Sequence, residues 1–485
     1  MTRTATRRAL ALLTLVLFLY PLPRVTAQTE VTGNWYAMLN AMGTELPMGL
    51  TLREADGQLS GVLLSPAQTD AEIPLSGVTY DGTRLTFDQE ALGASFSGVV
   101  DGDEIRGVFQ QASVDFKLTF TRAVPRDYPV GDGPVTLVAR PQEPRDFPYR
   151  REAVTFPGGA DSVRLAGELT LPENEPPRAL AILLGGSGPT DRNAFLGSQI
   201  NHSTFLVLSD YLTRRGYGVL RYDDRGVGES SGDFATATSE DMARDAHAAV
   251  RFLRGREGLA ELPVGLIGHS EGGMIAPVVA ALDGELDFLV LMAAPALPID
   301  QLMLRQSKDV SESMGLPPSI IERNQASLAA AYAFIKANPG LPTEDYEEGL
   351  YEVFAGQMDR LPEALRNSIK DPRAFNKQFV DGMTSPWFRY FIGFDPTDYL
   401  ERLTVPTLAL NGLNDVQVAG IDNLNAISAA TAVAGNEDVT LLPLVGINHL
   451  LQPSETGAVS EYGTITTTID EGVLEAIGGW LGERF

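Results

Sequence analysis

The chain has 485 residues, which is enough for two or three domains. Its formal net charge of −26 argues against nucleic acid and anionic membrane surfaces as partners, because both are bound mainly through lysine and arginine. The absence of cysteine excludes a cysteine nucleophile, a cysteine-ligated metal centre and a disulfide framework. A hydrophobic fraction of 44% and a charged fraction of 21% are typical of a globular protein.

The first residues have the layout of a secretory signal peptide. Arginines stand near the start, an apolar run covers 9–20, and small residues lead to Ala27. A membrane anchor is the alternative, but this run is too short for a helix to cross roughly 30 Å of hydrocarbon, and prolines follow it. We therefore expect cleavage after Ala27, no stable membrane insertion, and a secreted or periplasmic protein.

Residues 28–122 are predicted to form a small antiparallel β domain, a barrel or a sandwich. Short runs alternate apolar and polar residues, and Asp-Gly pairs such as Asp81-Gly82 separate them as turns. The opening Gly33-Asn34-Trp35-Tyr36 resembles lipocalin-like β-barrels, which implies a domain that could bind a ligand. The favoured interpretation is that the domain is structural or shields an active site.

Residues 123–150 are rich in proline and are predicted to be a linker. From residue 151 to 485, strands alternate with helices, which predicts an α/β fold with a mostly parallel sheet and helices on both faces. The expected elements are an opening hairpin (152–156 and 163–171), strands at 179–184, 219–222, 264–267, 288–292, 407–410 and 439–442, and helices at 204–215, 239–254 (capped by Ser239) and 466–481. Residues 296–400 interrupt this alternation with amphipathic helices and are predicted to be a cap over the active site.

Gly268-His269-Ser270-Glu271-Gly272 matches the G-x-S-x-G nucleophile elbow, a sharp strand-to-helix turn that exposes a serine hydroxyl. The same pattern occurs at 228–232, so the motif alone has little value in a chain with 48 glycines. Only Ser270 follows an apolar strand and precedes a run suited to a helix, whereas Ser230 lies in a polar loop. We therefore predict Ser270 as the nucleophile.

A serine hydroxyl needs a base to remove its proton, and the chain offers only four histidines. His269 adjoins the nucleophile and should point elsewhere, while His247 lies within a helix, where a solvated face is expected. His202 opens a helix, where local capping is expected, with the pocket rim as the alternative. His449 follows the last apolar strand, at the sheet edge where Ser270 lies, and is the predicted base.

The third member of the triad is predicted to be Asp415, which follows the strand at 407–410 at the same edge. A turn or N-cap role is the alternative for this aspartate. Asp422 is the nearest rival, but it falls within the next expected helix. The resulting chain order of Ser, Asp and His is that of the α/β-hydrolase fold.

An oxyanion hole requires backbone N–H groups that face the developing charge. The residue after the nucleophile, Glu271, is expected to supply one. The glycine-rich loop at 185–189 is expected to supply the other, with Ser187 as the predicted donor and Gly186 or Gly188 as alternatives.

Three segments together resemble bacterial α/β-hydrolases of the esterase and serine-aminopeptidase-like type: 185–193, 222–230 and 268–273. The resemblance covers residues 151–485 and implies the α/β-hydrolase fold with a cap. It also implies that the Asp-Asp-Arg-Gly-Val-Gly-Glu-Ser loop ending at Ser230 is structural. Many relatives have His-Gly where this chain has Gly185-Gly186, a departure that bears on the oxyanion donor.

The leading hypothesis is therefore a serine esterase that acts on a small-molecule carboxylic ester and needs no metal or organic cofactor. A serine peptidase or aminopeptidase of the same fold is the first alternative, with the acidic run 344–348 in the cap as a candidate site for a free amine. The second is a noncatalytic protein that binds a ligand in its β domain. Acyl and alcohol preference would be set by the cap.

Overall fold

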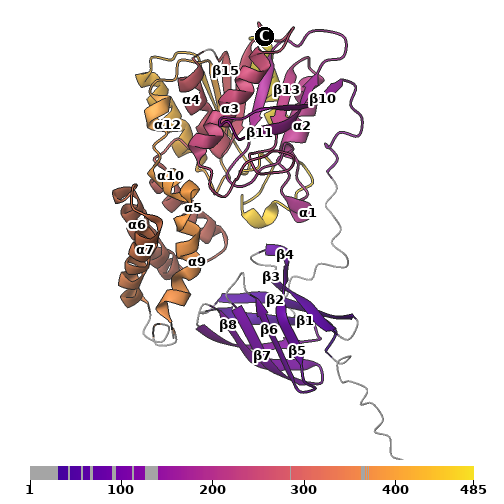
Figure 1. Cartoon of the computed structure of the whole chain (residues 1–485), viewed down its shortest axis with the longest axis vertical. Helices are drawn as coiled ribbons and strands as arrows, with labels where there is room; N and C mark the ends of the chain where they lie inside the picture. The colour runs from indigo at the N-terminus through magenta and orange to yellow at the C-terminus, as the bar shows by residue number, and fades with distance from the viewer. Residues whose placement is uncertain are drawn as a thin grey trace, which may run out of the picture.

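Figure 1 shows the computed structural model of the chain. The structure describes residues 31–41, 44–55, 58–65, 69–89, 94–111, 114–125, 140–284, 286–361, 366, 369 and 371–485. The expected signal peptide at 1–27 lies outside these residues. Within the described ranges, no helix has both the length and the apolar character needed to cross a membrane.

The N-terminal domain is a nine-stranded antiparallel sheet with strand order β4-β3-β2-β1-β9-β8-β7-β6-β5. The longest pairing joins β1 to β2, from Gly33 opposite Leu52 to Ala41 opposite Thr44. The two ends of this order, β4 and β5, are separated in the chain by Leu75 alone, so the sheet curls back upon itself. The strands are β1 Gly33–Ala41, β2 Thr44–Ala55, β3 Gln58–Ser65, β4 Thr69–Pro74, β5 Ser76–Tyr80, β6 Arg84–Gln89, β7 Ala94–Asp101, β8 Glu104–Gln111 and β9 Val114–Thr121.

The interior of this β domain is filled by its own side chains. Trp35 is fully buried and its indole N–H donates to the Val31 carbonyl at 2.8 Å. Phe96 stacks on Phe87 at 5.1 Å between ring centroids and meets Phe120 edge-on at 5.4 Å. Such aromatic pairs contribute to the packing of a core. The described interior is therefore a packed core, which favours a structural role for the domain.

The C-terminal domain is built on an eight-stranded sheet of order β10-β11-β13-β12-β14-β15-β16-β17. The pairs from β13–β12 to β16–β17 are parallel, while β10–β11 and β11–β13 are antiparallel. This sheet has the mostly parallel arrangement that the sequence predicts. The strands are β10 Arg150–Pro157, β11 Arg164–Leu171, β12 Leu180–Leu184, β13 Gly218–Tyr222, β14 Val264–His269, β15 Phe288–Met292, β16 Thr407–Gly412 and β17 Val439–Leu444.

Helices cover both faces of this sheet (Figure 1). One apolar layer joins the sheet to α2 and α13, and a second joins it to α3, α4 and α12. Strands β12 to β15 are buried along their length apart from His269, as expected where helices cover both faces of a parallel sheet. The helices are α1 Gly197–Ile200, α2 Thr204–Thr213, α3 Ser239–Arg254, α4 Glu271–Asp283, α12 Gly420–Val433 and α13 Glu471–Gly482.

A group of helices follows β15, as predicted for the cap. The aromatic side chains of α10 tie this group to the core, with Trp387 stacked on Phe391 at 4.8 Å between centroids and hydrogen-bonded to Glu271 of α4. The elements are α5 Ile299–Ser313, α6 Pro318–Ala337, α7 Thr343–Gln357, the 3-10 turn η3 Met358–Arg360, α9 Pro372–Thr384, α10 Pro386–Gly393 and α11 Thr397–Leu400.

One predicted helix cap and one predicted helix start are wrong. Helix α3 is capped by Thr238, not Ser239, because the Thr238 hydroxyl accepts from the Asp241 amide while the Asp241 carboxylate accepts from the Thr238 amide. The last helix begins at Glu471 and not at residue 466, because the Asp470 carboxylate caps it through the Gly472 amide. In both cases the better capping residue is the one whose side chain reaches the free amides.

Residues 140–149, near the end of the predicted linker, belong structurally to the hydrolase domain. The Arg140 guanidinium donates to backbone carbonyls that include those of Asn201 and Ile465. The Gln142 side-chain oxygen accepts from the amides of Thr468 and Ile469 at 2.7 and 3.0 Å. These polar side chains, rather than the prolines, fix the segment 140–149 on the domain.

Candidate active site

Ser270 occupies a sharp turn between β14 and α4. Its backbone has φ 54° and ψ −122°, a strained conformation for a residue with a side chain. A Cβ atom on Gly268 would lie 2.2 Å from the Gly272 carbonyl oxygen, and one on Gly272 would lie 2.2 Å from the Leu184 carbonyl oxygen. Only glycine therefore fits two positions before and two positions after the serine, which explains the spacing of the motif.

The His449 imidazole lies within hydrogen-bonding reach of this serine. Its Nε2 is 3.1 Å from the Ser270 Oγ. His449 follows β17 and is 4% exposed, so little water competes for the ring. The structure thus brings together two residues that are 179 positions apart in the chain.

The other ring nitrogen of His449 faces Asp415. The distance from Nδ1 to the Asp415 Oδ2 is 2.7 Å. The second carboxylate oxygen of Asp415 accepts from the amides of Gln417 and Val418, both at 2.8 Å. Asp415 therefore has both expected roles. One carboxylate oxygen accepts from the amides of the turn, and the other contacts the histidine.

Close contact between two loops sets the spacing of Asp415 and His449. A Cβ atom on Gly412, at the end of β16, would lie 2.1 Å from the Ile447 carbonyl oxygen. Within the second loop, the Asn448 side-chain oxygen accepts from the amides of Leu450 and Gln452 at 3.0 Å each. These contacts hold the imidazole at the carboxyl edge of the sheet, beside the serine.

The remaining histidines serve the structure around this site. His269 points away from the serine, as predicted, and its Nε2 lies 2.8 Å from the His449 carbonyl oxygen. Burial lowers the pKa of His269 to about 3, so the ring is neutral and Nε2 is the donor. His202 is fully buried against the Thr468 carbonyl and Thr204 rather than at a pocket rim.

The sequence predicts a solvated face for His247, but the structure shows this residue only partly exposed. Its side chain is 26% exposed and its Nε2 lies 3.1 Å from the Asp283 carboxylate. This contact joins α3 to the end of α4. Asp422, the rival to Asp415, lies in α12 as predicted and contacts Arg305 at 3.0 Å.

Ser230 has a structural position. Its buried hydroxyl donates to the Asp223 carbonyl at 2.7 Å and accepts from the Ala166 amide at 2.9 Å. Nearby, the Arg225 guanidinium pairs with the buried Asp245 at 2.7 Å. The segment therefore connects β11, β13 and α3 and leaves Ser230 without room to attack a substrate.

The glycine-rich loop approaches the serine at Gly186. A Cβ atom on Gly186 would lie 3.2 Å from the Ser270 Cβ and 3.7 Å from its Oγ. Ser187, the predicted oxyanion donor, is exposed. The geometry therefore favours Gly186 over Ser187 as the loop residue at the reacting centre. Glu271 directly follows Ser270 as the first residue of α4, as the elbow motif requires.

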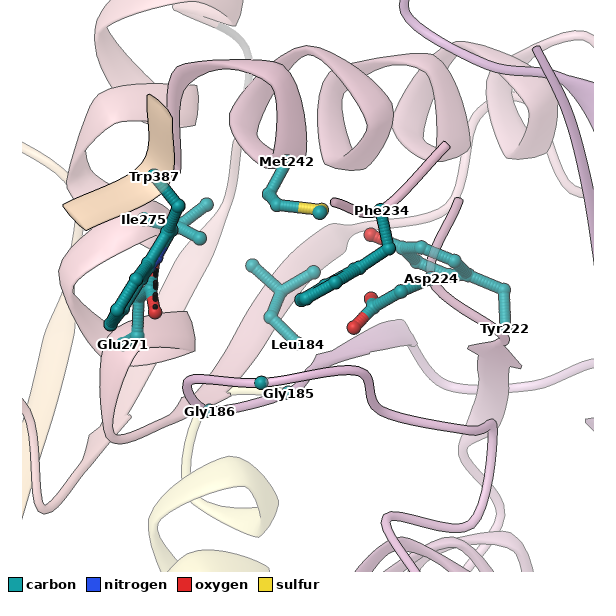
Figure 2. Close-up of a pocket in the computed structure, with 11 residues that line it drawn as sticks. Leu184, Gly185, Gly186, Tyr222, Asp224, Phe234, Met242, Glu271, Ile275 and Trp387 are labelled. Carbon is teal, nitrogen blue, oxygen red and sulfur yellow. Dashed lines mark hydrogen bonds between the residues drawn. The ribbon is translucent and has the colours of Figure 1, made fainter. Parts of the chain in front are cut away.

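A cleft opens beside the serine, and two carboxylates line it. It is narrow, with a cavity volume of about 30 Å³. Figure 2 shows Glu271 and Trp387 at one end and Asp224 at the other, with Gly185 and Gly186 along one side. The lining residues are Leu184, Gly185, Gly186, Gly188, Tyr222, Asp224, Phe234, Met242, Glu271, Ile275 and Trp387.

Both carboxylates are held by neutral donors. The Trp387 indole N–H donates to the two oxygens of Glu271 at 2.9 and 3.2 Å, and the Ser239 hydroxyl donates at 2.5 Å. Asp224 accepts from the Thr190 amide at 3.0 Å. Burial, aided by the charge of Glu271, raises the pKa of Asp224 to about 7.

Sequence reasoning missed these cleft residues as a group. Asp224 stands in a segment that the resemblance marks as structural, and the contact between Trp387 and Glu271 joins residues 116 positions apart. The one available signal was Glu271 itself, a charged residue at the start of an otherwise apolar helix. A charge buried in an apolar setting requires partners.

Several known proteins are similar to this chain. Residues 200–339 match the family described as serine aminopeptidase, S33. Esterase EstD of Thermotoga maritima is 26% identical over 317 residues, a match that spans 65% of this chain and 65% of the esterase. A non-heme chloroperoxidase of Burkholderia pyrrocinia is 28% identical over 241 residues, covering 49% of this chain and 77% of that protein. A Pyrococcus furiosus esterase structure is 17% identical, with a TM-score of 0.43 over 70% of this chain and 93% of that one.

The sheet order, the helices on both faces and the strained serine between β14 and α4 define an α/β-hydrolase. The predicted resemblance to bacterial α/β-hydrolases of the esterase and serine-aminopeptidase type is confirmed by these matches. The described N-terminal domain adds an antiparallel β sheet to that fold.

Proposed function

We propose that this protein is a serine hydrolase that cleaves carboxylic esters through an acyl-enzyme on Ser270. The observation that carries the proposal is the unbroken chain of contacts from Ser270 Oγ to His449 Nε2 and from His449 Nδ1 to Asp415. This is the arrangement in which a base activates a serine and a carboxylate orients the base. The similarity to EstD supports esters as the substrate class.

Acylation would begin with attack of the Ser270 Oγ on the acyl carbon while its proton passes to the His449 Nε2. Asp415 would stabilise the imidazolium that forms, because its carboxylate accepts the Nδ1–H bond. Collapse of the tetrahedral intermediate breaks the bond to the alcohol oxygen, which takes the proton from Nε2. Water then repeats the sequence on the acyl-enzyme and releases the acid.

Negative charge develops on the carbonyl oxygen during both steps. The amide of Glu271 stands at the N-terminus of α4, where free amides and the helix dipole favour an anion. We assign the second donor to the loop at Gly186, because this loop approaches Ser270 closely. Loss of one such donor typically slows catalysis about 10²–10³-fold.

Turnover of p-nitrophenyl acetate by two serine variants tests the proposal. We expect Ser270→Ala to abolish turnover above the uncatalysed rate, whereas Ser230→Ala, the matched control from the second motif, retains turnover if folded. Circular dichroism would establish folding of both. Wild-type turnover by Ser270→Ala would overturn the proposal.

A peptidase of the same fold is a second candidate, which the match of residues 200–339 to the serine aminopeptidase family favours. The chemistry at Ser270 would be the same, with an amine as the leaving group. Comparison of kcat/KM for a p-nitrophenyl ester and an aminoacyl p-nitroanilide separates the two. The ester is expected to react faster by several orders of magnitude if esters are the substrates.

A further inference from the structure

A buried arginine ties together several loops near the active site. Arg140 is 7% exposed, and within the part of the chain that the structure describes its guanidinium makes five hydrogen bonds, all to backbone carbonyls. A guanidinium has the same number of N–H donors, so each of them has an acceptor. Burial lowers the pKa of Arg140, which reflects the cost of removing this cation from water. The accepting carbonyls are those of Ile200, Asn201, Tyr462, Ile465 and Thr467.

Gln142 adds hydrogen bonds to the same part of the chain. Its side-chain oxygen accepts from the amides of Thr468 and Ile469 at 2.7 and 3.0 Å. Its side-chain nitrogen donates to the Ile469 carbonyl at 2.7 Å. Residues 140–142, which we call the strap, therefore hold the segment 462–469, which lies between the His449 loop and α13 in the chain.

The segment 462–469 also contacts the loop that carries His449. Gln452 of this loop is fully buried, and its side-chain nitrogen donates to the Thr467 carbonyl at 3.0 Å. The same carbonyl accepts from Arg140 at 3.4 Å, so the two side chains share one acceptor. The Leu451 carbonyl accepts from the Asp470 amide at 2.8 Å. The strap and the His449 loop are thus joined through one layer of backbone.

Further hydrogen bonds connect Gln452 to the residue before His449. The Asn448 side-chain nitrogen donates to the Gln452 side-chain oxygen at 3.1 Å, and the Asn448 amide donates to the Gln452 carbonyl at 3.0 Å. Leu451 has φ 63°, a left-handed conformation that costs free energy for a residue with a side chain. Such a conformation persists only where surrounding contacts hold it, so this loop depends on support from its neighbours.

A second route connects the strap to Asp415. The Gln417 amide donates to the Asp415 carboxylate at 2.8 Å, and its side-chain nitrogen donates to the Tyr462 hydroxyl at 2.9 Å. Tyr462 is buried, and its carbonyl accepts from Arg140 at 3.3 Å. The strap is therefore linked by hydrogen bonds to the surroundings of both residues that orient and accept the serine proton.

We infer that Arg140 and Gln142 are positioning residues, which hold the His449 loop so that Nε2 meets the Ser270 hydroxyl. The inference rests on the proposed hydrolase function and adds two residues to it. Both precede β10, the first strand of the hydrolase sheet, and stand in the segment predicted to be a linker. This end of the linker thus takes part in the hydrolase site.

A purely structural tie is the alternative, and the two roles differ in what a weakened strap changes. Loss of a structural tie lowers the fraction of molecules that are folded. Loss of a positioning residue lowers the rate at which each folded molecule reacts, because a misplacement of about 1 Å can slow catalysis about 10²-fold.

The kinetics of fluorophosphonate labelling separate these two effects. The final amount of adduct on Ser270 counts the competent molecules, while the second-order rate constant reports how well His449 activates the serine. Arg140→Lys keeps the charge, but an ammonium has fewer donors and lacks the planar fork. We expect this variant to lower the rate constant, and kcat for p-nitrophenyl acetate, about tenfold, with KM and the amount of adduct unchanged.

Gln142→Glu is a second, nearly isosteric variant. It keeps an oxygen for the amides of Thr468 and Ile469 but replaces the donor to the Ile469 carbonyl with a second acceptor. We expect the labelling rate constant to fall about threefold, because one of several bonds is lost. This variant decides the question if Arg140→Lys does not fold.

Arg254→Lys is the matched control. Arg254 likewise donates to two backbone carbonyls, at 3.1 and 2.8 Å, but these belong to the loop before β14. That loop lies at the start of the strand, whereas Ser270 follows its end. The control should therefore keep the wild-type labelling rate constant even if its melting temperature falls.

The outcomes separate the inference from the function on which it rests. Equal rate constants for the wild type and the folded strap variants would overturn the positioning role and leave the hydrolase intact. Less adduct at an unchanged rate constant, or an equal decrease in Arg254→Lys, would likewise reduce the strap to a structural tie. Absence of wild-type labelling and turnover would overturn the hydrolase function and the inference together.

Discussion

At the scale of single residues, the candidate site depends on the two carboxylate oxygens of Asp415. Asp415 uses one oxygen for two backbone amides and the other for the His449 Nδ1. The amides fix the carboxylate, and the carboxylate in turn fixes the tautomer of the ring, so that Nε2 is free to accept the serine proton. Orientation of the His449 ring therefore requires both the negative charge of Asp415 and its two acceptor oxygens.

We predict that Asp415→Asn lowers kcat about 10³–10⁴-fold with little change in folding, because an amide in place of the carboxylate disturbs the tautomer. Steady-state turnover of p-nitrophenyl acetate measures the loss. Asp422→Asn is the control, since that residue lies on α12 and contacts Arg305. Equal activity of the two variants would show that Asp415 has no role in catalysis.

A second residue-scale prediction concerns pH. Because burial raises the pKa of Asp224 to about 7, the folded protein holds this proton more tightly than the unfolded chain, whose aspartates titrate near 3.9. Wild-type stability therefore falls as the pH rises from about 4 to 7, and Asp224→Asn removes this loss. The melting temperature of the variant relative to the wild type should increase between pH 5 and pH 8.

Differential scanning calorimetry at the two pH values measures that difference. Glu240→Gln, an exposed change on α3, should show no such trend. A variant whose relative melting temperature is constant from pH 5 to pH 8 would mean that Asp224 is ionised across this range in the folded protein.

At the scale of elements, the strand ends determine where the side chains meet. Strands β14, β16 and β17 run parallel or share parallel neighbours, so Ser270, Asp415 and His449 all emerge at one edge. The sequence predicts this arrangement because each strand is a short apolar run with a clear end. What it could not predict is the close contact of Gly412 with Ile447, since that depends on loop packing.

We predict that Gly412→Ala lowers both the melting temperature and the activity, because the added Cβ would lie 2.1 Å from the Ile447 carbonyl oxygen and force the loops apart. Overpacking of this kind typically costs about 1–3 kcal/mol. Gly340→Ala is the control, because a Cβ at that position meets nothing within 4 Å. Thermal melts and turnover of both variants test this, and a Gly412→Ala protein like the wild type would contradict it.

The helix caps give a further prediction at this scale. Thr238→Ala should destabilise the protein by about 1 kcal/mol, because Thr238 and Asp241 form the capping box of α3. Urea denaturation gives the difference. The sequence placed the cap one residue later, at Ser239, because both residues are good caps and only the structure shows that Ser239 bonds to Glu271 instead. A Thr238→Ala variant as stable as the wild type would refute the capping box.

At the scale of the whole molecule, the chain order of domains was readable from the change of periodicity, from alternating short strands to alternating strands and helices. The fold class was predictable because both signals are local. The contact of Trp387 with Glu271 and the docking of Arg140 were not, since each joins segments more than 100 residues apart.

We propose that the protein is exported, as the arginine-led apolar start predicts. To test this, the full chain, with residues 1–27 included, would be expressed in a bacterial host. N-terminal sequencing of the mature protein then shows where the chain begins. The mature chain should begin at Gln28 and be found in the periplasm or medium. A chain that retains its first residues in the cytoplasm would contradict export.

The central claim is that Ser270 is the nucleophile of a serine hydrolase. Its most direct test is reaction of the folded wild-type protein with a fluorophosphonate probe, followed by peptide mass spectrometry to locate the adduct. The account predicts one adduct per chain, on Ser270, and none on the Ser270→Ala variant. An adduct on another serine, or equal labelling of the two proteins, would contradict it.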